Sequence, residues 1–101
     1  MAHFLYIIHS EAAKRYYVGE SVDPHIRVQQ HNAHAFKGSA TTMASDWLLK
    51  VVIPCEDRAH ARALEKWVKS QKSTAIIKRL INEQQYREYQ VARFRKPPSG
   101  A

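Results

Sequence analysis

Five side chains of the sequence have the types that proton-transfer and phosphate chemistry use: Tyr6, Tyr17, Arg27, His31 and Glu65. A guanidinium is planar and permanently charged, so Arg27 is suited to bind two oxygens of a phosphate. A carboxylate such as Glu65 supplies the hard oxygens that Mg²⁺ prefers, and the ion would keep several waters. A phenol has an unperturbed pKa of about 10, so a tyrosine acts as a base only beside a cation or a proton acceptor. Such groups could hydrolyse a phosphodiester, which needs an activated nucleophile and stabilisation of growing negative charge.

The two tyrosines are expected on neighbouring strands of a hairpin. Residues 4–8 are a short apolar run rich in β formers, and residues 15–19 form a second such run after a polar turn over 10–14. The period of two puts Tyr17 and Gly19 on one face of the second strand and Tyr16 and Val18 on the other. Tyr17 is therefore expected on the face of the sheet opposite Tyr16 and Val18.

A helix is predicted to follow the hairpin directly. The carboxylate of Asp23 can cap free amide groups, and Pro24 at the first helical position loses no useful donor. Arg27 and His31 lie four residues apart and so share a face of this helix. If that face crosses Tyr6 and Tyr17, it brings them a cation and a proton acceptor.

The second half of the chain is expected to add one strand and at least two helices. Residues 33–46 have no clear period and indicate a loop, and residues 47–53 indicate a third strand that ends at Pro54. Glu56 or Asp57 then begins a helix with Glu65 at the edge of its apolar face. That face is predicted to consist of Ala59, Ala63, Leu64, Trp67, Val68 and Gln71.

A further helix is predicted from Ser73 to about Asn82, with Ile76, Ile77, Leu80 and Ile81 as its apolar face. Residues 83–96 either prolong that helix or contain an edge strand at 89–94. The expected fold is an α+β fold with a small three-stranded antiparallel sheet flanked by helices. We expect one domain over residues 1–96, with a core at 4–82, an extension at 83–96 and a disordered tail at 97–101.

Composition and charge narrow the expected class of protein. Hydrophobic residues make up 45% and charged residues 25% of the 101 residues, as in ordinary globular domains. Neither a membrane-spanning apolar run nor a signal-peptide pattern occurs, and the single cysteine, Cys55, fits a reducing compartment, so a cytoplasmic location is expected. The formal net charge is +7, with five Lys or Arg against four Asp or Glu through Cys55, and eleven against five from Glu56 onward. Such a basic excess suits nucleic acid, or it serves only as a solvated surface.

Four motifs in order resemble the GIY-YIG nuclease domain. They are the triplet Phe4-Leu5-Tyr6, the triplet Tyr17-Val18-Gly19, Arg27 inside the following helix, and Glu65 on a later helix. Together with Gln30-His31, their spacing is most similar to that of the short single-domain members. The resemblance extends roughly over residues 4–82.

The resemblance implies a role for each of these residues. Tyr6 and Tyr17 would be the paired active-site tyrosines, Arg27 would stabilise the transition state, and His31 would accept the proton of a tyrosine. Glu65 would be the sole protein ligand of one divalent ion, Mg²⁺ or Mn²⁺. Nucleic-acid contacts are expected at four further positions, Gly19, Lys37, Lys69 and Lys72, and the hydroxyl residues of the loop that holds Lys37 are also candidates for phosphate contacts. The implied activity is one-metal hydrolysis of DNA.

Three positions depart from the family pattern. Phe4 stands where the first glycine of the motif would be, although short members often lack that glycine. Glu20 follows Gly19 where a lysine or small polar residue is more usual, and its carboxylate could repel phosphate. Asn82 is a weak match to the asparagine that some relatives place after the metal-binding glutamate, and it also fits an ordinary helix end.

Two functions from different classes therefore stand open. The first is a metal-dependent DNA endonuclease, with branched or damaged DNA as the substrate by analogy, RNA not excluded, and a protein partner as a potential source of specificity. The second is a non-catalytic nucleic-acid-binding module on the same scaffold, with Glu20 marking decay of the site. Considered singly, the tyrosines are also ordinary strand residues and the charged residues ordinary surface groups.

Overall fold

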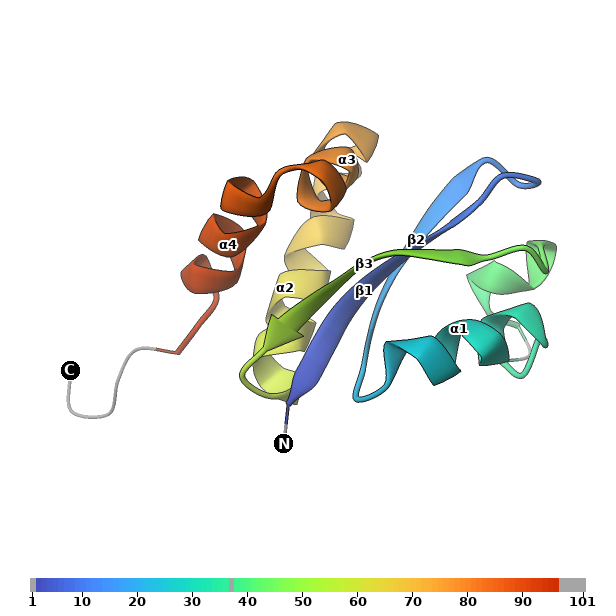
Figure 1. The fold of residues 1–101 in the computed structure, drawn as a ribbon, viewed down its shortest axis with the longest axis horizontal. Helices are drawn as coiled ribbons and strands as arrows, with labels where there is room; N and C mark the ends of the chain where they lie inside the picture. Colours follow the sequence, from blue (N-terminus) through green and yellow to red (C-terminus); the bar gives the residue numbers. More distant parts are fainter. Residues whose placement is uncertain (1, 37, 97–101) are drawn as a thin grey trace.

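The computed structural model describes residues 2–36 and 38–96. It contains a three-stranded antiparallel sheet and four α-helices, which confirms the predicted fold class (Figure 1). The elements in chain order are β1 (His3–Ser10), β2 (Arg15–Ser21), α1 (Pro24–Asn32), a 3₁₀ helix η1 (Ala40–Met43), β3 (Leu48–Cys55), α2 (Arg58–Gln71), α3 (Thr74–Asn82) and α4 (Gln84–Arg93). Lys37 and residues 97–101 lie outside the described residues, so the contact expected of Lys37 and the predicted tail are not addressed.

The sheet has the strand order β2-β1-β3, so β1 is central. Tyr6 pairs with Gly19 of β2 on one side and with Val52 of β3 on the other. Each of the first two strands extends two residues beyond its predicted C-terminal end. Pro54 lies inside β3 rather than ending it, because β3 is an edge strand and proline needs no ladder partner there.

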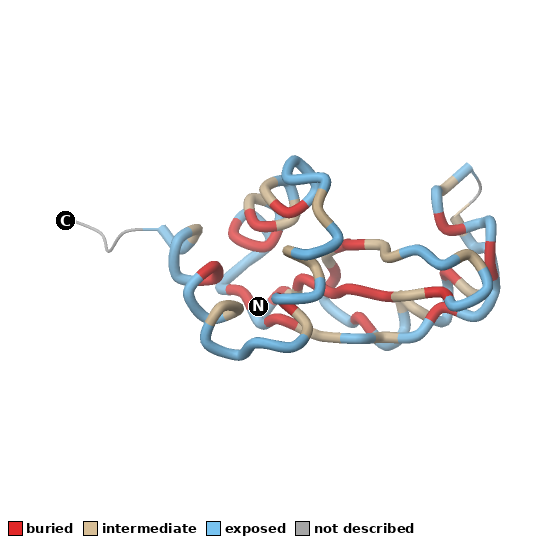
Figure 2. Tube along the Cα trace, turned by 90° about the horizontal axis from the view of Figure 1, so that it is seen from above, coloured by how far each residue is buried: buried red, intermediate tan, exposed pale blue. Residues whose placement is uncertain are grey.

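One face of the sheet packs against α2, α3 and α4 and forms the main apolar core. Leu5 and Ile7 of β1 are fully buried there against Leu64, Leu80 and other apolar side chains. Figure 2 shows buried residues along the strands and on the inward sides of the helices. This face is assembled by the alternation of strand residues and by the amphipathic period of the helices.

The opposite face of the sheet packs against α1, η1 and the segment before β3. Its core cluster contains Tyr6, Ile8, Ala44 and Trp47, with Tyr17 at its margin. Figure 1 shows α1 on one side of the strands and α2, α3 and α4 on the other. The alternation predicted for β2 is confirmed, since Val18 lies in the main core and Tyr17 on the opposite face.

The helix starts follow the predicted caps. The side chains of Asp23, Asp57 and Ser73 each accept a hydrogen bond from a backbone N–H of the first turn of α1, α2 and α3. Asp57, not Glu56, caps α2. No helix among the described residues is long and apolar enough to cross a membrane.

Three predictions in the second half are wrong in detail. The segment 33–46 is not wholly a loop, since it contains η1. The buried face of α2 is centred on His60, Ala61, Leu64 and Val68, whereas Ala59 and Gln71 are exposed. Residues 84–93 form a separate helix after a turn at Glu83, so neither the prolonged helix nor the strand at 89–94 exists. The helix α4 is held by Val91, which is buried in the main core.

Candidate active site

An open cleft at the β2 edge of the sheet brings together the phenols, imidazole, guanidinium and carboxylate that the sequence singles out. Its volume is about 380 Å³. Both faces contribute to it, because α1 reaches it from one face and α2 from the other. The lining residues are Tyr6, Tyr17, Gly19, Glu20, Arg27, His31, Phe36, Ser39, Arg58 and Glu65.

Tyr6 and His31 form the buried centre of the cleft wall. The Tyr6 Oη and His31 Nε2 atoms are 2.8 Å apart, and only 2% of Tyr6 and 3% of His31 are exposed. Burial, followed by the neighbouring Tyr17, raises the pKa of Tyr6 above its ordinary value, and the opposing effect of Arg27 is smaller. Burial and then the Arg27 guanidinium lower the pKa of His31. At neutral pH the pair is therefore a phenol beside a neutral imidazole.

This result corrects one step of the reasoning from sequence. A cation and a proton acceptor beside the tyrosines were expected to depress a tyrosine pKa. Arg27 does act in that direction on Tyr6, but the loss of hydration of a phenolate in the wall outweighs it. The phenol of Tyr6 thus stays protonated in the wall, within hydrogen-bond distance of His31, rather than existing as a free phenolate.

Tyr17 lies beside this pair and closer to solvent. Its ring centroid is 6.5 Å from that of Tyr6 and 5.0 Å from that of His31, with an edge-on contact to the imidazole. The Lys69 Nζ atom lies 5.2 Å from the centre of the Tyr17 ring. Tyr17 therefore connects the buried pair to the charged side chains of α2.

Gly19 makes room for the ring of Tyr6. A Cβ atom at this position would lie 2.5 Å from Tyr6 Oη and 2.6 Å from Tyr6 Cζ, both far inside contact distance. The resemblance implies a nucleic-acid contact at Gly19. The structure shows a more direct reason for a glycine here, because any side chain would collide with the Tyr6 phenol.

Arg27 and Phe36 form the wall on the α1 side. The guanidinium carbon of Arg27 lies 5.1 Å from the centre of the Phe36 ring, and Phe36 also contacts His31 at 5.0 Å between ring centroids. A cation over an aromatic face is stabilised while its N–H groups stay free for an anion. Phe36 was missed at the sequence level, because a single aromatic residue in an irregular segment has no periodic signal.

Glu65 and Lys69 form an ion pair on the α2 side. The Lys69 Nζ atom donates to Glu65 Oε2 at 2.9 Å, and 19% of the Glu65 side chain is exposed. No group of three or more His, Cys, Asp or Glu that could enclose a metal ion occurs in the described part of the chain. One carboxylate facing an open cleft fits a hydrated ion such as Mg²⁺ or Mn²⁺, which takes most of its ligands from water and substrate.

Glu20 and Arg58 complete the rim of the cleft. The Glu20 carboxylate is hydrogen-bonded to His3, and the Arg58 Nε atom lies 3.7 Å from Glu20 Oε1. The charge of Glu20, which sequence reasoning flagged as a source of repulsion, thus has cationic and polar partners. Arg58 was missed, although its spacing of seven residues from Glu65 places both on one side of α2.

Some predicted contact residues lie outside the cleft. Lys72 ends α2 in a left-handed conformation, with a φ of 49°, and does not line the cleft. Asn82 ends α3 and does not line it either. Thr41, one of the loop hydroxyl residues considered for phosphate contacts, is only 1% exposed and is bonded to His31, so it cannot reach a phosphate.

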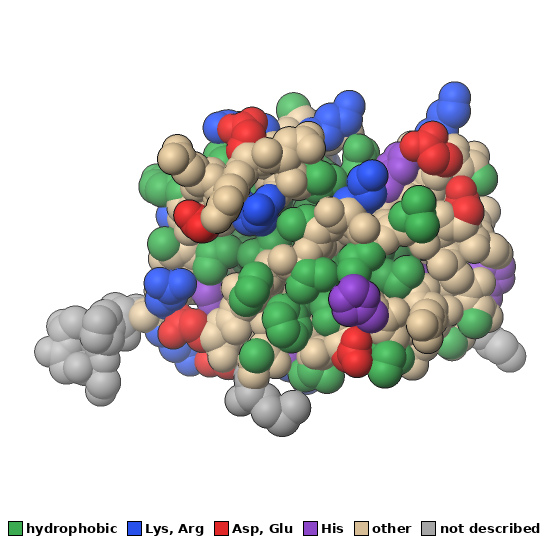
Figure 3. Space-filling model, viewed as in Figure 1, with side chains coloured by type: hydrophobic (Ala, Val, Ile, Leu, Met, Phe, Trp, Pro, Cys, Tyr) green, Lys and Arg blue, Asp and Glu red, His purple; other side chains and the backbone are tan. Residues whose placement is uncertain are grey.

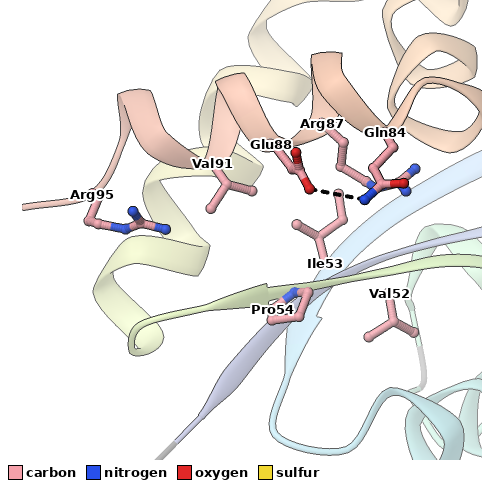
Figure 4. A pocket seen from close by; sticks show the side chains of 8 residues that line it. All are labelled: Val52, Ile53, Pro54, Gln84, Arg87, Glu88, Val91 and Arg95. Carbon is pink, nitrogen blue, oxygen red and sulfur yellow. Dashed lines mark hydrogen bonds between the residues drawn. The ribbon is translucent and has the colours of Figure 1, made fainter.

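A second cavity of about 370 Å³ lies between β3 and α4 (Figure 4). Its floor is formed by Val52, Ile53 and Pro54 of β3, and charged groups of α4 lie above them. The Arg87 guanidinium already donates to the carbonyl oxygens of Leu80 and Ile81 at the end of α3. The lining includes no phenol or imidazole, so this cavity lacks the combination of groups that the cleft brings together.

The surface around these elements is not uniformly basic. On the face shown in Figure 3, hydrophobic side chains gather across the middle, with Lys and Arg lying mainly above and to the left of them. On α2, four exposed cations lie on the flank next to Glu65, namely Arg58, Arg62, Lys66 and Lys69. Four of the eleven Lys and Arg residues that follow Cys55 therefore lie beside the cleft on this helix.

Comparison with known proteins gives one match. The family model described as the GIY-YIG catalytic domain matches residues 2–90. That range includes every described residue that lines the cleft. No significant match was found among curated proteins or among solved structures.

Proposed function

We propose that this chain, which belongs to the GIY-YIG catalytic domain family, is a DNA endonuclease that uses one divalent metal ion. The family is made up of endonucleases, which are generally metal-dependent. One observation carries the proposal for this chain. Tyr6, Tyr17, Arg27 and Glu65, from four different elements, share a single opening of about 380 Å³.

Glu65 is the residue that would hold the ion, with Mg²⁺ or Mn²⁺ favoured by its hard oxygens. When bound, the ion would neutralise the charge that grows on the phosphoryl and leaving oxygens. Lys69 occupies one oxygen of Glu65 and must be displaced or shared for this to happen. No second ion is proposed, because the other carboxylate of the cleft, Glu20, is engaged by His3 and Arg58.

Tyr6 and His31 would move the proton of the attacking water. Because burial raises the pKa of Tyr6, the phenol works as a relay rather than as a stored phenolate. Its oxygen takes a proton from water while its own proton passes to His31 Nε2, 2.8 Å away. The hydroxide attacks phosphorus, the bond to the leaving oxygen breaks, and solvent returns a proton to that oxygen.

Arg27 and Tyr17 would hold the phosphate during this attack. Arg27 offers a charged fork to two non-bridging oxygens, and its stacking on Phe36 fixes the direction of the fork. Tyr17 can donate a hydrogen bond to the same phosphate from the solvent side of the Tyr6–His31 pair. Arg58 supplies a second cation at the opposite rim.

The cationic flank of α2 would bind the strand that leads to the cleft. From Arg58 to Lys69 it extends about 16 Å along the helix at 1.5 Å per residue. Arg62 and Lys66 form no hydrogen bond or ion pair with any described residue, so both are available to phosphates. Lys69 lies at the boundary between this flank and the metal-binding carboxylate. Lys37 and Lys72 are proposed as outlying contacts of the same kind.

Cleavage and binding can be separated in one experiment. Purified protein is incubated with supercoiled, single-stranded, branched and RNA substrates, with Mg²⁺, Mn²⁺ or chelator. Glu65→Gln and Arg27→Ala should each reduce nicking at least about 100-fold, while salt-sensitive binding persists. Glu88→Gln and Arg95→Ala make the same changes at the β3–α4 cavity and should leave nicking unchanged. Nicking that survives in both cleft variants would overturn the proposal.

A non-catalytic nucleic-acid-binding module is the second candidate. Glu20 favours it, because a carboxylate in the cleft opposes the approach of a phosphate unless His3 and Arg58 neutralise it. The module would bind DNA with an affinity that falls steeply as the salt concentration rises. In a plot of log affinity against log salt concentration, the double variant Arg62→Ala, Lys66→Ala should reduce the slope by about 0.9 for each lost phosphate contact. It would show no metal-dependent nicking with any substrate above.

A further inference from the structure

A buried hydroxyl group lies directly behind the imidazole of the cleft. The His31 Nδ1 and Thr41 Oγ1 atoms are 2.7 Å apart, on the side of the ring opposite Tyr6. Thr41 Oγ1 is in turn 3.0 Å from Ser39 Oγ. Four polar side chains thus form one chain of hydrogen bonds, from Tyr6 in the wall to Ser39 at the rim.

The direction of these hydrogen bonds decides whether His31 can accept a proton. A neutral imidazole carries one N–H, so only one of its nitrogens can accept. If Nδ1–H donates to Thr41, Nε2 accepts from Tyr6. If the Thr41 hydroxyl instead donates to Nδ1, Nε2–H donates to the Tyr6 oxygen, and His31 cannot take the proton of Tyr6.

The surroundings of Thr41 favour the first arrangement. In it the Thr41 hydroxyl donates to Ser39 Oγ. The one hydroxyl proton without an acceptor in this chain of hydrogen bonds is then that of Ser39, which is half-buried and lines the open cleft. In the second arrangement the hydroxyl proton without an acceptor is that of Tyr6. Only 2% of Tyr6 is exposed, at the wall of the cleft, and its only hydrogen-bond partner within residues 2–36 and 38–96 is His31. An unpaired buried donor costs more than one facing solvent.

The position of Thr41 is fixed by a second set of hydrogen bonds. The Trp47 indole Nε1–H donates to the Thr41 carbonyl oxygen at 2.9 Å. The backbone of Trp47 exchanges two hydrogen bonds with the Asn32 side chain at the end of α1, at 2.7 and 3.0 Å. Trp47 is 2% exposed, so these three hydrogen bonds hold η1 against α1 in the apolar cluster of that face.

We propose that Thr41 is a positioning residue that keeps His31 in the Nδ1–H tautomer, so that Nε2 is free to accept the proton of Tyr6. The inference deepens the proposed endonuclease function and rests on it for its role in catalysis. The tautomer of His31 can be measured whether or not the protein cleaves DNA. The two claims can therefore fail separately.

The first test reads the tautomer in the unmodified protein. Long-range ¹H–¹⁵N correlation spectra of protein with ¹⁵N-labelled histidine should show His31 with a protonated Nδ1 and an unprotonated Nε2 at neutral pH. A protonated Nε2 with an unprotonated Nδ1 would overturn the proposal, whatever the nuclease assay gives. The expected tautomer together with absent cleavage would leave the positioning intact and reject the proposed function.

The second test removes the hydroxyl. Thr41→Val keeps the volume and removes the acceptor, so His31 should lose its single tautomer, and kcat should fall about 10- to 100-fold with little change in KM. Thr41→Ser restores the hydroxyl and should restore both signals, and it remains informative if the valine variant folds poorly. Thr74→Val makes the same change at an exposed position of α3 and should have no effect. Equal losses in the serine and valine variants, or an unchanged His31 spectrum in the valine variant, would contradict the proposal.

Discussion

The two faces of the sheet differ sharply in chemistry although they are built from alternate residues of the same strands. On the α2–α4 face, Leu5 and Ile7 meet an apolar core. One residue away on the other face, Tyr6 meets an imidazole, and Tyr17 lies beside it. Because a shift of one residue in a strand would exchange the two sets, the apolar core also fixes which residues reach the cleft.

The polar face is stable because its buried polar groups are paired. Across residues 2–36 and 38–96, no buried side-chain nitrogen or oxygen lacks a hydrogen-bond partner. On the apolar face one buried polar residue is His60, whose ring bonds the Val91 carbonyl oxygen and the Glu56 N–H. An imidazole thus links α2 and α4 on one face, whereas on the other face the imidazole of His31 is hydrogen-bonded to the phenol of Tyr6.

The sharpest contrast between the faces comes from one change made on each. Tyr6→Phe removes the proposed proton relay and should lower the rate of DNA nicking about 10²- to 10⁴-fold, the usual contribution of acid–base catalysis. The lost hydrogen bond to His31 should cost only about 1 kcal/mol of stability. Tyr16→Phe removes a hydroxyl from the residue that packs on the apolar core and should leave the rate unchanged. Similar rates for the two variants would refute a catalytic role for Tyr6.

The converse change weakens the apolar face and spares the cleft. Leu80→Ala removes a fully buried side chain of α3 and should reduce the free energy of unfolding by about 3 kcal/mol. Urea denaturation measures this loss. Nicking per folded molecule should not change, since α3 contributes no residue to the cleft. A lower rate per folded molecule would mean that the two faces are mechanically coupled.

Gly19 is the point at which strand geometry and chemistry depend on each other. Gly19→Ala places a methyl group within 2.5 Å of the Tyr6 oxygen, so the phenol must move. Displacement of a reacting group by about 1 Å can cost about 100-fold in rate. In a Tyr6→Phe background the same change should add little, because the affected group is already absent. Full additivity in the double variant would show that Gly19 acts by another route.

The elements that local signals specify could be predicted, and those that depend on distant contacts could not. The hairpin, α1 and α3 follow from alternation and from the caps at Asp23 and Ser73. The nature of 84–93 depends on Val91 reaching the core and on Phe94 packing against Trp67 of α2, 5.9 Å between ring centroids. No pattern within residues 84–93 contains that information.

The candidate site shows the same division. Tyr6, Tyr17, Arg27 and Glu65 were selected by order and spacing, and the structure brings them into one cleft. Arg58 was missed because its partner, Glu20, is 38 residues away in the sequence. Thr41 was misjudged because its burial depends on Trp47 folding η1 onto α1. The direction of the Tyr6 pKa shift was misjudged for a related reason, since burial can be known only once the whole wall is assembled.

The titration of His31 reports whether water reaches its imidazole inside the polar face. Burial and Arg27 both lower the pKa of this imidazole, so in an NMR titration it should stay neutral below the ordinary value of about 6.5. Arg27→Gln removes one of the two causes and should move the titration to higher pH. The folded state holds this proton less tightly than the unfolded chain does. The contribution of His31 to stability is therefore complete above about pH 6.5 and declines as the pH falls further. A midpoint at or above the ordinary value would mean that water enters the wall.

The smallest expected effect concerns the place where the two faces meet, at the ion pair between Lys69 and Glu65. The ammonium holds the carboxylate that would bind the metal, so Lys69→Met should increase the affinity for Mn²⁺. A largely exposed ion pair contributes at most about 1 kcal/mol, which corresponds to at most about a fivefold tighter ion. Titration of Mn²⁺ followed by electron paramagnetic resonance measures this without any turnover. Lys66→Met removes a neighbouring cation that has no partner among the described residues, and it should change the affinity less. If both variants bind the ion equally, the field of the whole α2 flank controls metal binding, and the direct contact to Glu65 does not.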